Sequence, residues 1–261
     1  MSGLAVVIPA APGSPWLDPC LASLVVEEPD AVYVVSEEPP PAGLPLSPQH
    51  ISGRGGFAAR ANAALAAARS EGYARALLLN DDTEVRPGAV AALSGPEPLL
   101  GAVLEHWDGG VQQAGLRVSR RSARVRAIEE EPHGKQQVDA IGGAALALDL
   151  DLWSELGGFD ERYAFYFEDV DFCLRAAAAG VDAWITSQAR VRHRGGGTRS
   201  HRHPDAAYHL GRSHTLLARE LGGALRYGVV AGAGLAWTAR SVGVGGVPTF
   251  LRGMRDGLRI R

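Results

Sequence analysis

Short apolar runs that alternate with helical stretches are the feature that most constrains the fold of this chain. Three runs, 4–8, 31–35 and 76–79, contain no charged residue, and stretches with helical character at 16–25 and 57–72 separate them. Unbroken apolar strands separated by helices are typical of a parallel sheet covered by helices on both faces. Ligands of such sheets bind beyond the carboxyl ends of the strands, so the residues that follow each run are candidates for a site.

The later segments continue the alternation. In the 57–72 helix, Phe57, Ala61, Leu65 and Ala68 fall on one face and Gly72 can end it. The other expected elements are a helix and turn at 86–100, a strand at 99–107, an exposed loop or hairpin at 108–138, a helix at 168–179 stopped by Gly180, a strand at 183–186, and helical structure from about 205.

Composition excludes several classes of protein. A net charge of −3 argues against a protein that coats nucleic acid, so no nucleic-acid partner is expected. Cys20 and Cys173 form no CxxC pair, which disfavours a disulfide framework or a structural zinc site and fits the cytoplasm. The N-terminus has no basic leader before its apolar run, and no apolar stretch reaches the roughly 20 residues that span a bilayer. A peripheral or cytoplasmic protein is therefore expected.

The stretch NDDT (80–83) follows the third apolar run directly. Asn80 and Asp82 are two residues apart, so at a strand end their side chains can point the same way. Amide and carboxylate oxygens are hard ligands that suit Mg²⁺ or Mn²⁺. Alternatively, Asp81, Asp82 and Thr83 only form a turn that caps the next helix. Both interpretations stay open at this point.

A second group of acids begins the predicted helix at 168. Glu168, Asp169 and Asp171 follow three aromatic residues at 165–167, and Arg175 lies about one turn further on. Acids at a helix N-terminus are favoured by the helix dipole, which is the structural explanation. An aromatic wall can also raise the pKa of a carboxyl group toward that of a useful base.

Glycine-rich and histidine-rich stretches offer further candidates. His193 precedes three glycines and could complete a metal site with Asp82, or serve structure alone. The stretch 201–214 adds four histidines among arginines, where a second metal site is a weaker alternative. GRGG (53–56) opens a helix in an anion-friendly manner. Neither a GxGxxG fingerprint in the right context nor a GxxxxGK[ST] loop occurs, which disfavours an NAD enzyme or a P-loop kinase.

The order of these motifs resembles the inverting nucleotide-sugar glycosyltransferases of family 2, in particular their rhamnosyltransferase-like branch. The resemblance covers about residues 4–215 and rests on VVIP, GGFAARAN, LLLNDDTEV, GGFDERYAFYFEDVDFCLR and VRHRGGGT. It implies a GT-A fold, an α/β architecture with a Rossmann-like, mostly parallel central sheet, helices on both faces and C-terminal helices. It divides the chain into a GT-A domain at 1–215, with a nucleotide-sugar-binding half at about 1–105 and an acceptor-binding half at about 106–215, and a helical extension at 216–261.

The resemblance also implies roles for single residues. Asp82 matches the ligand of a divalent cation, Mn²⁺ or Mg²⁺, on the donor diphosphate, and His193 matches a position that helps to ligate it. Asp169 matches the base that deprotonates the acceptor hydroxyl, with Glu168 as the alternative. One base suffices for in-line attack with inversion, unlike the carboxylate pair of a retaining hydrolase. The matching donor-binding positions are Pro9, Ser36, Glu37, Gly56, Arg60, Asn62, Asn80, Asp81, Gly143 and Ala144.

One departure concerns the nucleobase. The family has DNxSxD after the second strand, and its first Asp holds the base, whereas Ser36 and Glu37 occupy that place here. Either Glu37 substitutes or recognition of the base is loose. The donor nucleotide, dTDP, UDP or GDP, is therefore left open.

Arginines recur among apolar residues in the C-terminal stretch 222–261, at 226, 240, 252, 255, 259 and 261. Amphipathic helices of this composition could lie on an anionic membrane surface, at the inner face of the cell membrane, where lipid-linked acceptors are found. A packed helix with an exposed basic face is the alternative.

The expected function is a metal-dependent inverting transfer of a sugar, rhamnose among the candidates, from a nucleoside diphosphate to a hydroxyl. The acceptor is a cell-surface polysaccharide or lipid-linked glycan, with a small secondary metabolite as the alternative. A nucleotidyltransferase usually needs a basic Gly-rich loop after the first strand, and IPAAPGSP has no basic residue. Glu168 and Asp169 argue against a non-catalytic sugar-nucleotide-binding homologue, whereas the missing nucleobase Asp leaves this alternative open.

Overall fold

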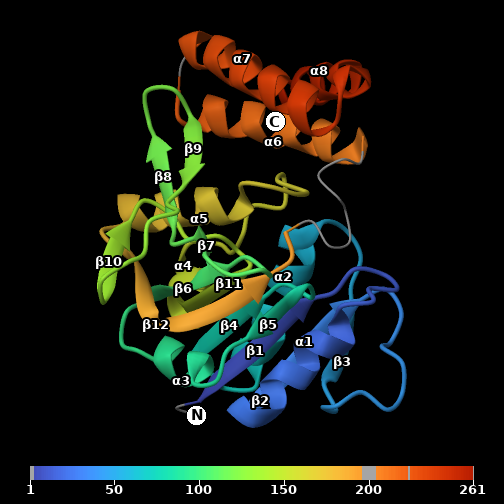
Figure 1. The fold of residues 1–261 in the computed structure, drawn as a ribbon, viewed down its shortest axis with the longest axis vertical. Coiled ribbons are helices and arrows are strands. Elements are labelled where there is room, and N and C mark those ends of the chain that lie inside the picture. The colour runs from blue at the N-terminus through green and yellow to red at the C-terminus, as the bar shows by residue number, and fades with distance from the viewer. Residues whose placement is uncertain (1–2, 196–203, 223, 261) are drawn as a thin grey trace.

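The N-terminal half of the chain forms a block of four parallel strands in the order β3-β2-β1-β4 (Figure 1). The structure is a computed structural model that describes residues 3–195, 204–222 and 224–260. The four strands are β1 (Leu4–Pro9), β2 (Ala31–Ser36), β3 (Gln49–Ser52) and β4 (Arg75–Leu79). The three apolar runs thus form strands as predicted, and β3, which is mostly polar, joins them at the edge.

Strand β11 (Ala145–Asp149) changes the direction of the sheet. It lies between β4 and β6 (Leu99–Glu105) and is antiparallel to both. Beyond it, β12 (Ala183–His193) runs parallel to β6, and β10 (Lys135–Val138) closes the edge. The short strands β5 (Thr83–Val85) and β7 (Val111–Gln113) pair with β12 and β6. The expected parallel order therefore holds in the first half, whereas the second half is mixed.

Helices cover both faces of the sheet. Ala5 and Val7 of β1 belong to the core under α2 (Phe57–Ser70) and α5 (Glu168–Ala178). Their neighbours Val6 and Ile8 belong to the core on the other face. That second face is covered by α1 (Leu17–Leu24) and α3 (Ala89–Leu93), whereas α4 (Leu150–Glu155) lies with α2. Because successive side chains of a strand point to opposite faces, burial on both sides explains the uninterrupted apolar runs.

Two expected elements have different lengths. The helix expected from residue 86 is the five-residue α3, because Gly88 adopts φ +84° immediately before it and Gly95 and Pro96 follow. The strand expected at 183–186 continues to His193 as β12, after a register irregularity between Thr186 and Arg190. This extension carries His193 back to the centre of the molecule.

The polar region at 108–138 contains the expected hairpin, formed by β8 (Leu116–Ser119) and β9 (Arg124–Ala127). Its tip reaches the C-terminal helices, since Nε2 of His214 lies 2.8 Å from the carbonyl oxygen of Ala123. The hairpin therefore spans the distance from the sheet to these helices, as Figure 1 shows.

Three helices end the chain: α6 (Pro204–Glu220), α7 (Ala224–Ser241) and α8 (Val247–Gly257), and the short 3₁₀ turn η2 (Val244–Gly246) joins the last two. Another 3₁₀ turn, η1 (Val25–Glu27), follows α1. Glycines bring α6 and α8 into close contact. A Cβ atom on Gly253 would lie 2.1 Å from the carbonyl oxygen of Tyr208, and one on Gly257 2.5 Å from that of Arg212.

The boundary expected at 215 falls inside α6, whose residues are continuous from 204 to 220. Among the described residues, no helix is both long and apolar enough to cross a membrane.

We expect Gly253→Ala to destabilise the protein by about 2 kcal/mol, because the new methyl group overlaps a backbone carbonyl that cannot rotate away. Gly232→Ala on α7 is the matched control, since its Cβ meets no atom within 4 Å. Alanine in an exposed helix interior should leave stability unchanged or raise it by up to about 1 kcal/mol. Urea unfolding followed by circular dichroism measures both changes, and equal midpoints for the two variants would contradict the close helix contact.

Candidate active site

A cleft of about 380 Å³ lies at the carboxyl ends of β1 and β4. Strand ends, the start of α5, the β8–β9 hairpin and α6 all contribute to its wall. Its lining includes Pro9, Ala11, Pro12, Phe57, Arg60, Asn80, Asp81, Asp82, Leu116, Val125, Gly143, Ala144, Phe165, Tyr166, Phe167, Glu168, Asp169, His193, Ala206 and His209. The cleft thus brings together most of the residues that the sequence singles out, as a parallel sheet predicts.

One end of the cleft gathers an amide, a carboxylate and an imidazole. Nδ2 of Asn80 and Oδ1 of Asp82 each lie 3.4 Å from Nε2 of His193. The two side chains therefore point the same way, as their spacing after β4 predicts. Asp82 is 5% exposed, and Oδ1 of Asn80 is buried without a hydrogen-bond partner. A buried amide oxygen without a donor is an available ligand for a cation.

Strand pairing explains how His193 reaches residues more than a hundred positions earlier in the chain. β5 follows the NDD turn directly, and it pairs antiparallel with β12 so that His193 lies opposite Thr83. Thr83 also closes the turn, because its hydroxyl donates to the carbonyl oxygen of Asn80 at 2.7 Å. The sequence identifies the turn, but only this pairing places the imidazole beside it.

Gln112 fixes the orientation of the imidazole. Its Oε1 lies 2.8 Å from Nδ1 of His193, and its Nε2 donates to the His193 carbonyl oxygen at 3.2 Å. Since an amide oxygen only accepts, Nδ1 carries the hydrogen, and Nε2 faces Asp82 and Asn80. This is the usual arrangement of a metal-ligating histidine, whose second nitrogen donates to a carbonyl or carboxylate.

Two tryptophans hold the residue that follows His193. The guanidinium carbon of Arg194 lies 3.8 Å from the ring centroid of Trp16 and 3.7 Å from that of Trp107. The Arg194 amide also donates to the carbonyl oxygen of Asp82 at 3.2 Å. Such cation–π contacts contribute about 1 kcal/mol or more when partly desolvated. They anchor the end of β12 against the NDD turn.

Asp81 points away from this group. Its Oδ2 accepts the Ala11 amide at 2.8 Å, which ties the turn to the loop after β1. Burial raises the pKa of Asp81, although the hydrogen bonds from Ala11 and Ser14 act in the opposite direction. The NDDT stretch therefore forms a tight turn, but this turn leads into β5 and does not cap a helix, since the N-cap of α3 is Gly88. The same turn directs Asn80 and Asp82 toward His193.

The opposite side of the cleft carries the start of α5. Two bulky residues, Tyr166 and Phe167, adopt φ +68° and +70° immediately before Glu168. Left-handed conformations of such residues are strained, and they occur preferentially at functional sites. They turn the chain so that α5 begins at the cleft wall.

The two adjacent acids of α5 have different surroundings. Oδ2 of Asp169 accepts the Gly143 amide at 2.6 Å, and Oδ1 accepts the Val170 amide at 2.7 Å. Oε2 of Glu168 is buried without a hydrogen-bond partner. Burial raises the pKa of Glu168 well above its usual range and also raises the pKa of Asp169, where the two amide donors oppose the shift. Asp171 instead accepts from Arg175 at 2.8 Å and supports the helix.

Four of the expected donor-binding residues lie outside the cleft lining. The Ser36 hydroxyl donates to the carbonyl oxygen of Glu38 at 2.6 Å, and Glu37 is exposed. A Cβ on Gly56 would lie 2.1 Å from the Ala164 carbonyl oxygen, so this glycine permits backbone contact. Asn62 donates to the Phe159 carbonyl oxygen at 2.8 Å and accepts the Phe159 amide at 2.9 Å. It therefore holds the 156–162 loop rather than facing the cleft.

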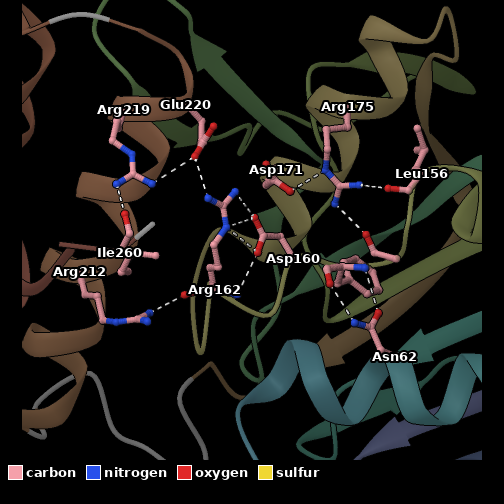
Figure 2. A network of polar contacts seen from close by, with 12 residues as sticks. Asn62, Leu156, Asp160, Arg162, Asp171, Arg175, Arg212, Arg219, Glu220 and Ile260 are labelled. Atoms are coloured by element: carbon pink, nitrogen blue, oxygen red, sulfur yellow. Dashed lines mark hydrogen bonds and ion pairs between the residues drawn. The ribbon is translucent and has the colours of Figure 1, made fainter. Parts of the chain in front are cut away.

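No pattern in the sequence indicates that α6 holds the aromatic loop in front of α5. Ser213 donates to the Phe165 carbonyl oxygen at 2.7 Å, and Arg212 donates to that of Arg162 at 2.5 Å. Arg162 also bridges Asp160 and Glu220, at 2.6 and 3.3 Å (Figure 2). Helix α6 is therefore part of the wall of the site.

The histidine-rich stretch forms no second metal site among the described residues. His201 and His203 lie outside them, the ring of His209 packs on Phe165 at 5.0 Å, and His214 binds the hairpin tip. Within the described ranges, no group of three His, Cys, Asp or Glu side chains could hold a metal ion. The candidate cation site has only two side chains of these four types, Asp82 and His193. Its third candidate ligand is the amide oxygen of Asn80.

Comparisons with known proteins support the fold. No protein-family model matches the chain. Uncharacterized proteins Mb1552 of Mycobacterium bovis and Rv1525 of Mycobacterium tuberculosis are 30% identical over 153 residues, which are 57% of this chain and 57% of each relative. Protein y4gI of Sinorhizobium fredii is 28% identical over 170 residues, 56% of this chain and 18% of that protein. The chain thus spans just over half the length of the mycobacterial relatives it matches.

The structure of GalNAc-T7 with UDP, GalNAc and Mn²⁺ superposes with a TM-score of 0.60 and 14% identity. The match covers 84% of this chain and 47% of that one. At this identity the likeness establishes architecture alone. The mixed α/β fold with a central sheet between helices is that of the GT-A glycosyltransferases.

Proposed function

We propose that this protein is a metal-dependent inverting glycosyltransferase that moves a sugar from a nucleoside diphosphate donor to a hydroxyl group. The observation that carries the proposal is the division of one cleft between a cation-type ligand set and a pair of adjacent carboxyl groups. Asn80, Asp82 and His193 form the first, and Glu168 and Asp169 the second. The GT-A fold, the resemblance to family 2 and the Mn²⁺ and UDP in the structural neighbour agree with it.

The residues at the metal end fit a divalent cation, Mn²⁺ or Mg²⁺. Asp82 supplies a carboxylate oxygen, Asn80 an amide oxygen without a donor, and His193 a nitrogen oriented by Gln112. Such an ion supplies stabilisation of the negative charge that develops on the departing diphosphate. The other proposed donor contacts that line the same cleft are Pro9, Arg60, Asp81, Gly143 and Ala144.

Asp169 is the proposed base. Two backbone amides hold its carboxylate in one orientation and favour its ionised form, so it can accept the proton of an acceptor hydroxyl. Oε2 of Glu168 has no hydrogen-bond partner, and only the backbone amide of Glu168 itself opposes the effect of burial, so its raised pKa keeps it protonated to higher pH. A neutral Glu168 avoids a second negative charge next to Asp169. A single base is what an inverting transfer requires.

The proposed acceptor side is the apolar wall made by Phe165, Tyr166, Leu116, Val125 and α6. It suits a hydroxyl carried on a sugar ring or on a lipid-linked glycan, with a small secondary metabolite as the alternative. The donor nucleotide is left open among dTDP, UDP and GDP, because neither Ser36 nor Glu37 lines the cleft. A non-catalytic sugar-nucleotide-binding role is the second candidate, and this missing nucleobase contact is the observation that favours it.

Binding of a nucleoside diphosphate should stabilise the native chain only when Mn²⁺ and Asp82 are both present. At a ligand concentration 100 times the dissociation constant, the gain is about 2.7 kcal/mol. UDP, dTDP and GDP, each with and without Mn²⁺, are compared by thermal unfolding on the native chain, on Asp82→Ala and on Asp151→Ala, an exposed control. A shift that survives Asp82→Ala would remove this residue from the metal site.

Asp169→Asn should lower kcat for transfer by about 10²–10⁴-fold and leave the thermal shift with donor unchanged, because it removes only the proton acceptor. Radiolabelled sugar transfer and donor hydrolysis measure the first effect. Glu168→Gln is measured in parallel. Unchanged transfer in Asp169→Asn together with a loss in Glu168→Gln would move the base to Glu168, whereas a native chain that binds donor without turnover would favour the binding-protein alternative.

Stability should depend on pH through Glu168. Its folded-state pKa is raised by burial, so its favourable contribution is present below the ordinary value of 4.5 and is lost as pH rises through the folded-state pKa. Glu168→Gln should therefore be more stable than the native chain at neutral and alkaline pH, by a margin that shrinks toward acid pH. Urea unfolding at several pH values tests this, with the exposed Glu155→Gln as control, and a margin independent of pH would contradict it.

A further inference from the structure

Charge is strongly segregated along the chain. Residues 224–261 contain six arginines and one aspartate, a charge of +5, whereas the other 20 basic and 28 acidic side chains give −8. The basic part coincides with α7 and α8, which form the outer end of the molecule in Figure 1. An anionic surface attracts the basic C-terminal end of such a molecule and repels the rest, which is net acidic.

The packing of α8 determines which of its faces is exposed. Phe250, Gly253 and Gly257 are buried, and the two glycines touch the backbone of α6. The opposite face runs along α8 and the turn that follows it, at helical spacing. This exposed stripe consists of Pro248, Leu251, Arg252, Arg255, Leu258 and Arg259.

Large apolar side chains are exposed at this end more than elsewhere. Seven large hydrophobic residues are exposed among the described residues, and four of them belong to α7, η2, α8 or the turn after α8. Val244 is 81% exposed, Leu258 55% and Leu251 46%, and Val229 is the fourth. Single exposed leucines are ordinary, but a group of exposed apolar side chains among arginines at one end of the molecule indicates a binding surface.

The exposed stripe and Val244 form, we propose, a contact surface for an anionic lipid bilayer. Arginines lie beside both leucines of the stripe, so the stripe has no uncharged apolar centre of the kind that a protein–protein interface has. An interfacial helix has this mixture, because its leucines enter the headgroup region while arginine side chains extend their guanidinium groups to lipid phosphates. Arg255 is partly neutralised by Asp256 at 3.1 Å, which makes Arg252 and Arg259 the principal cations.

This surface is connected to the cleft through a single helix. α8 packs on α6, and α6 contributes Ala206 and His209 to the cleft lining. A bilayer on the outer face of α8 would therefore lie one helix away from the apolar side of the site. The inference goes beyond the proposed function and does not depend on it, because lipid binding needs neither donor nor acceptor.

Cosedimentation of the full chain with vesicles tests the surface. Vesicles of phosphatidylcholine alone are compared with vesicles that contain an equal part of phosphatidylglycerol, at low and at high salt. We expect binding to the anionic vesicles at low salt, weakened by salt. Each arginine near an anionic surface contributes about fivefold, so Arg252→Glu/Arg259→Glu should weaken binding by more than about tenfold. Leu251→Ser/Leu258→Ser should weaken it by about tenfold through lost burial.

Matched controls lie on the acidic body. Arg54→Glu/Arg69→Glu changes the charge equally at exposed positions, and Val25→Ser/Val26→Ser removes the two exposed valines of η1. Both controls should bind like the native chain. The proposal is overturned if the native chain ignores anionic vesicles at low salt, or if binding persists in both α8 variants. A dimer in solution that dissociates in Leu251→Ser/Leu258→Ser, without vesicle binding, would assign the surface to a second copy.

Discussion

The antiparallel strand β11 is the constraint on which the site depends. It pairs with β4 on one side and β6 on the other, so it joins the parallel N-terminal block to the second half in one sheet. The two residues before β11 contact both sides of the cleft, the side with Asn80 and the side with Asp169. The Ala144 carbonyl oxygen accepts the amide of Asn80, and the Gly143 amide donates to Asp169. A shift in the position of β11 would therefore move the possible cation site and the proposed base relative to each other.

The loop before α5 is held from two directions, and this support balances its strain. A bulky residue in the left-handed region costs on the order of 1–3 kcal/mol, and Tyr166 and Phe167 are consecutive. On one side Arg175 donates to the carbonyl oxygens of Leu156 and Gly158; on the other, the α6 residues Arg212 and Glu220 contact Arg162 (Figure 2). The ring of Phe167 also packs on His214 at 4.9 Å. Helix α6 is therefore an integral part of the site and not an appendage to it.

Local patterns predicted what depends on local physics. The alternation of side chains placed Asn80 and Asp82 together, and the helical spacing identified the buried face of α2, where Ala61, Leu65 and Ala68 are inaccessible. The features that the sequence does not predict depend on contacts with residues far away in the chain. Asn62 was expected at the donor, but its amide is saturated by a loop about 97 residues later in the chain. The reversal of β11, the edge strand β3 and the role of Gln112 have no local signature, because each follows from which strand lies beside which.

The charges that line the cleft give an independent reason for a cation. Among the described residues, its lining holds four acids, Asp81, Asp82, Glu168 and Asp169, and one arginine, Arg60. Burial raises the pKa of Asp81, Glu168 and Asp169, which lowers the negative charge that the protein itself must hold there. A diphosphate would add further negative charge beside Asp82 and be repelled by it. A divalent ion held by Asp82, Asn80 and His193 would supply positive charge that offsets this repulsion. The metal dependence that we propose is consistent with this charge distribution in the cleft.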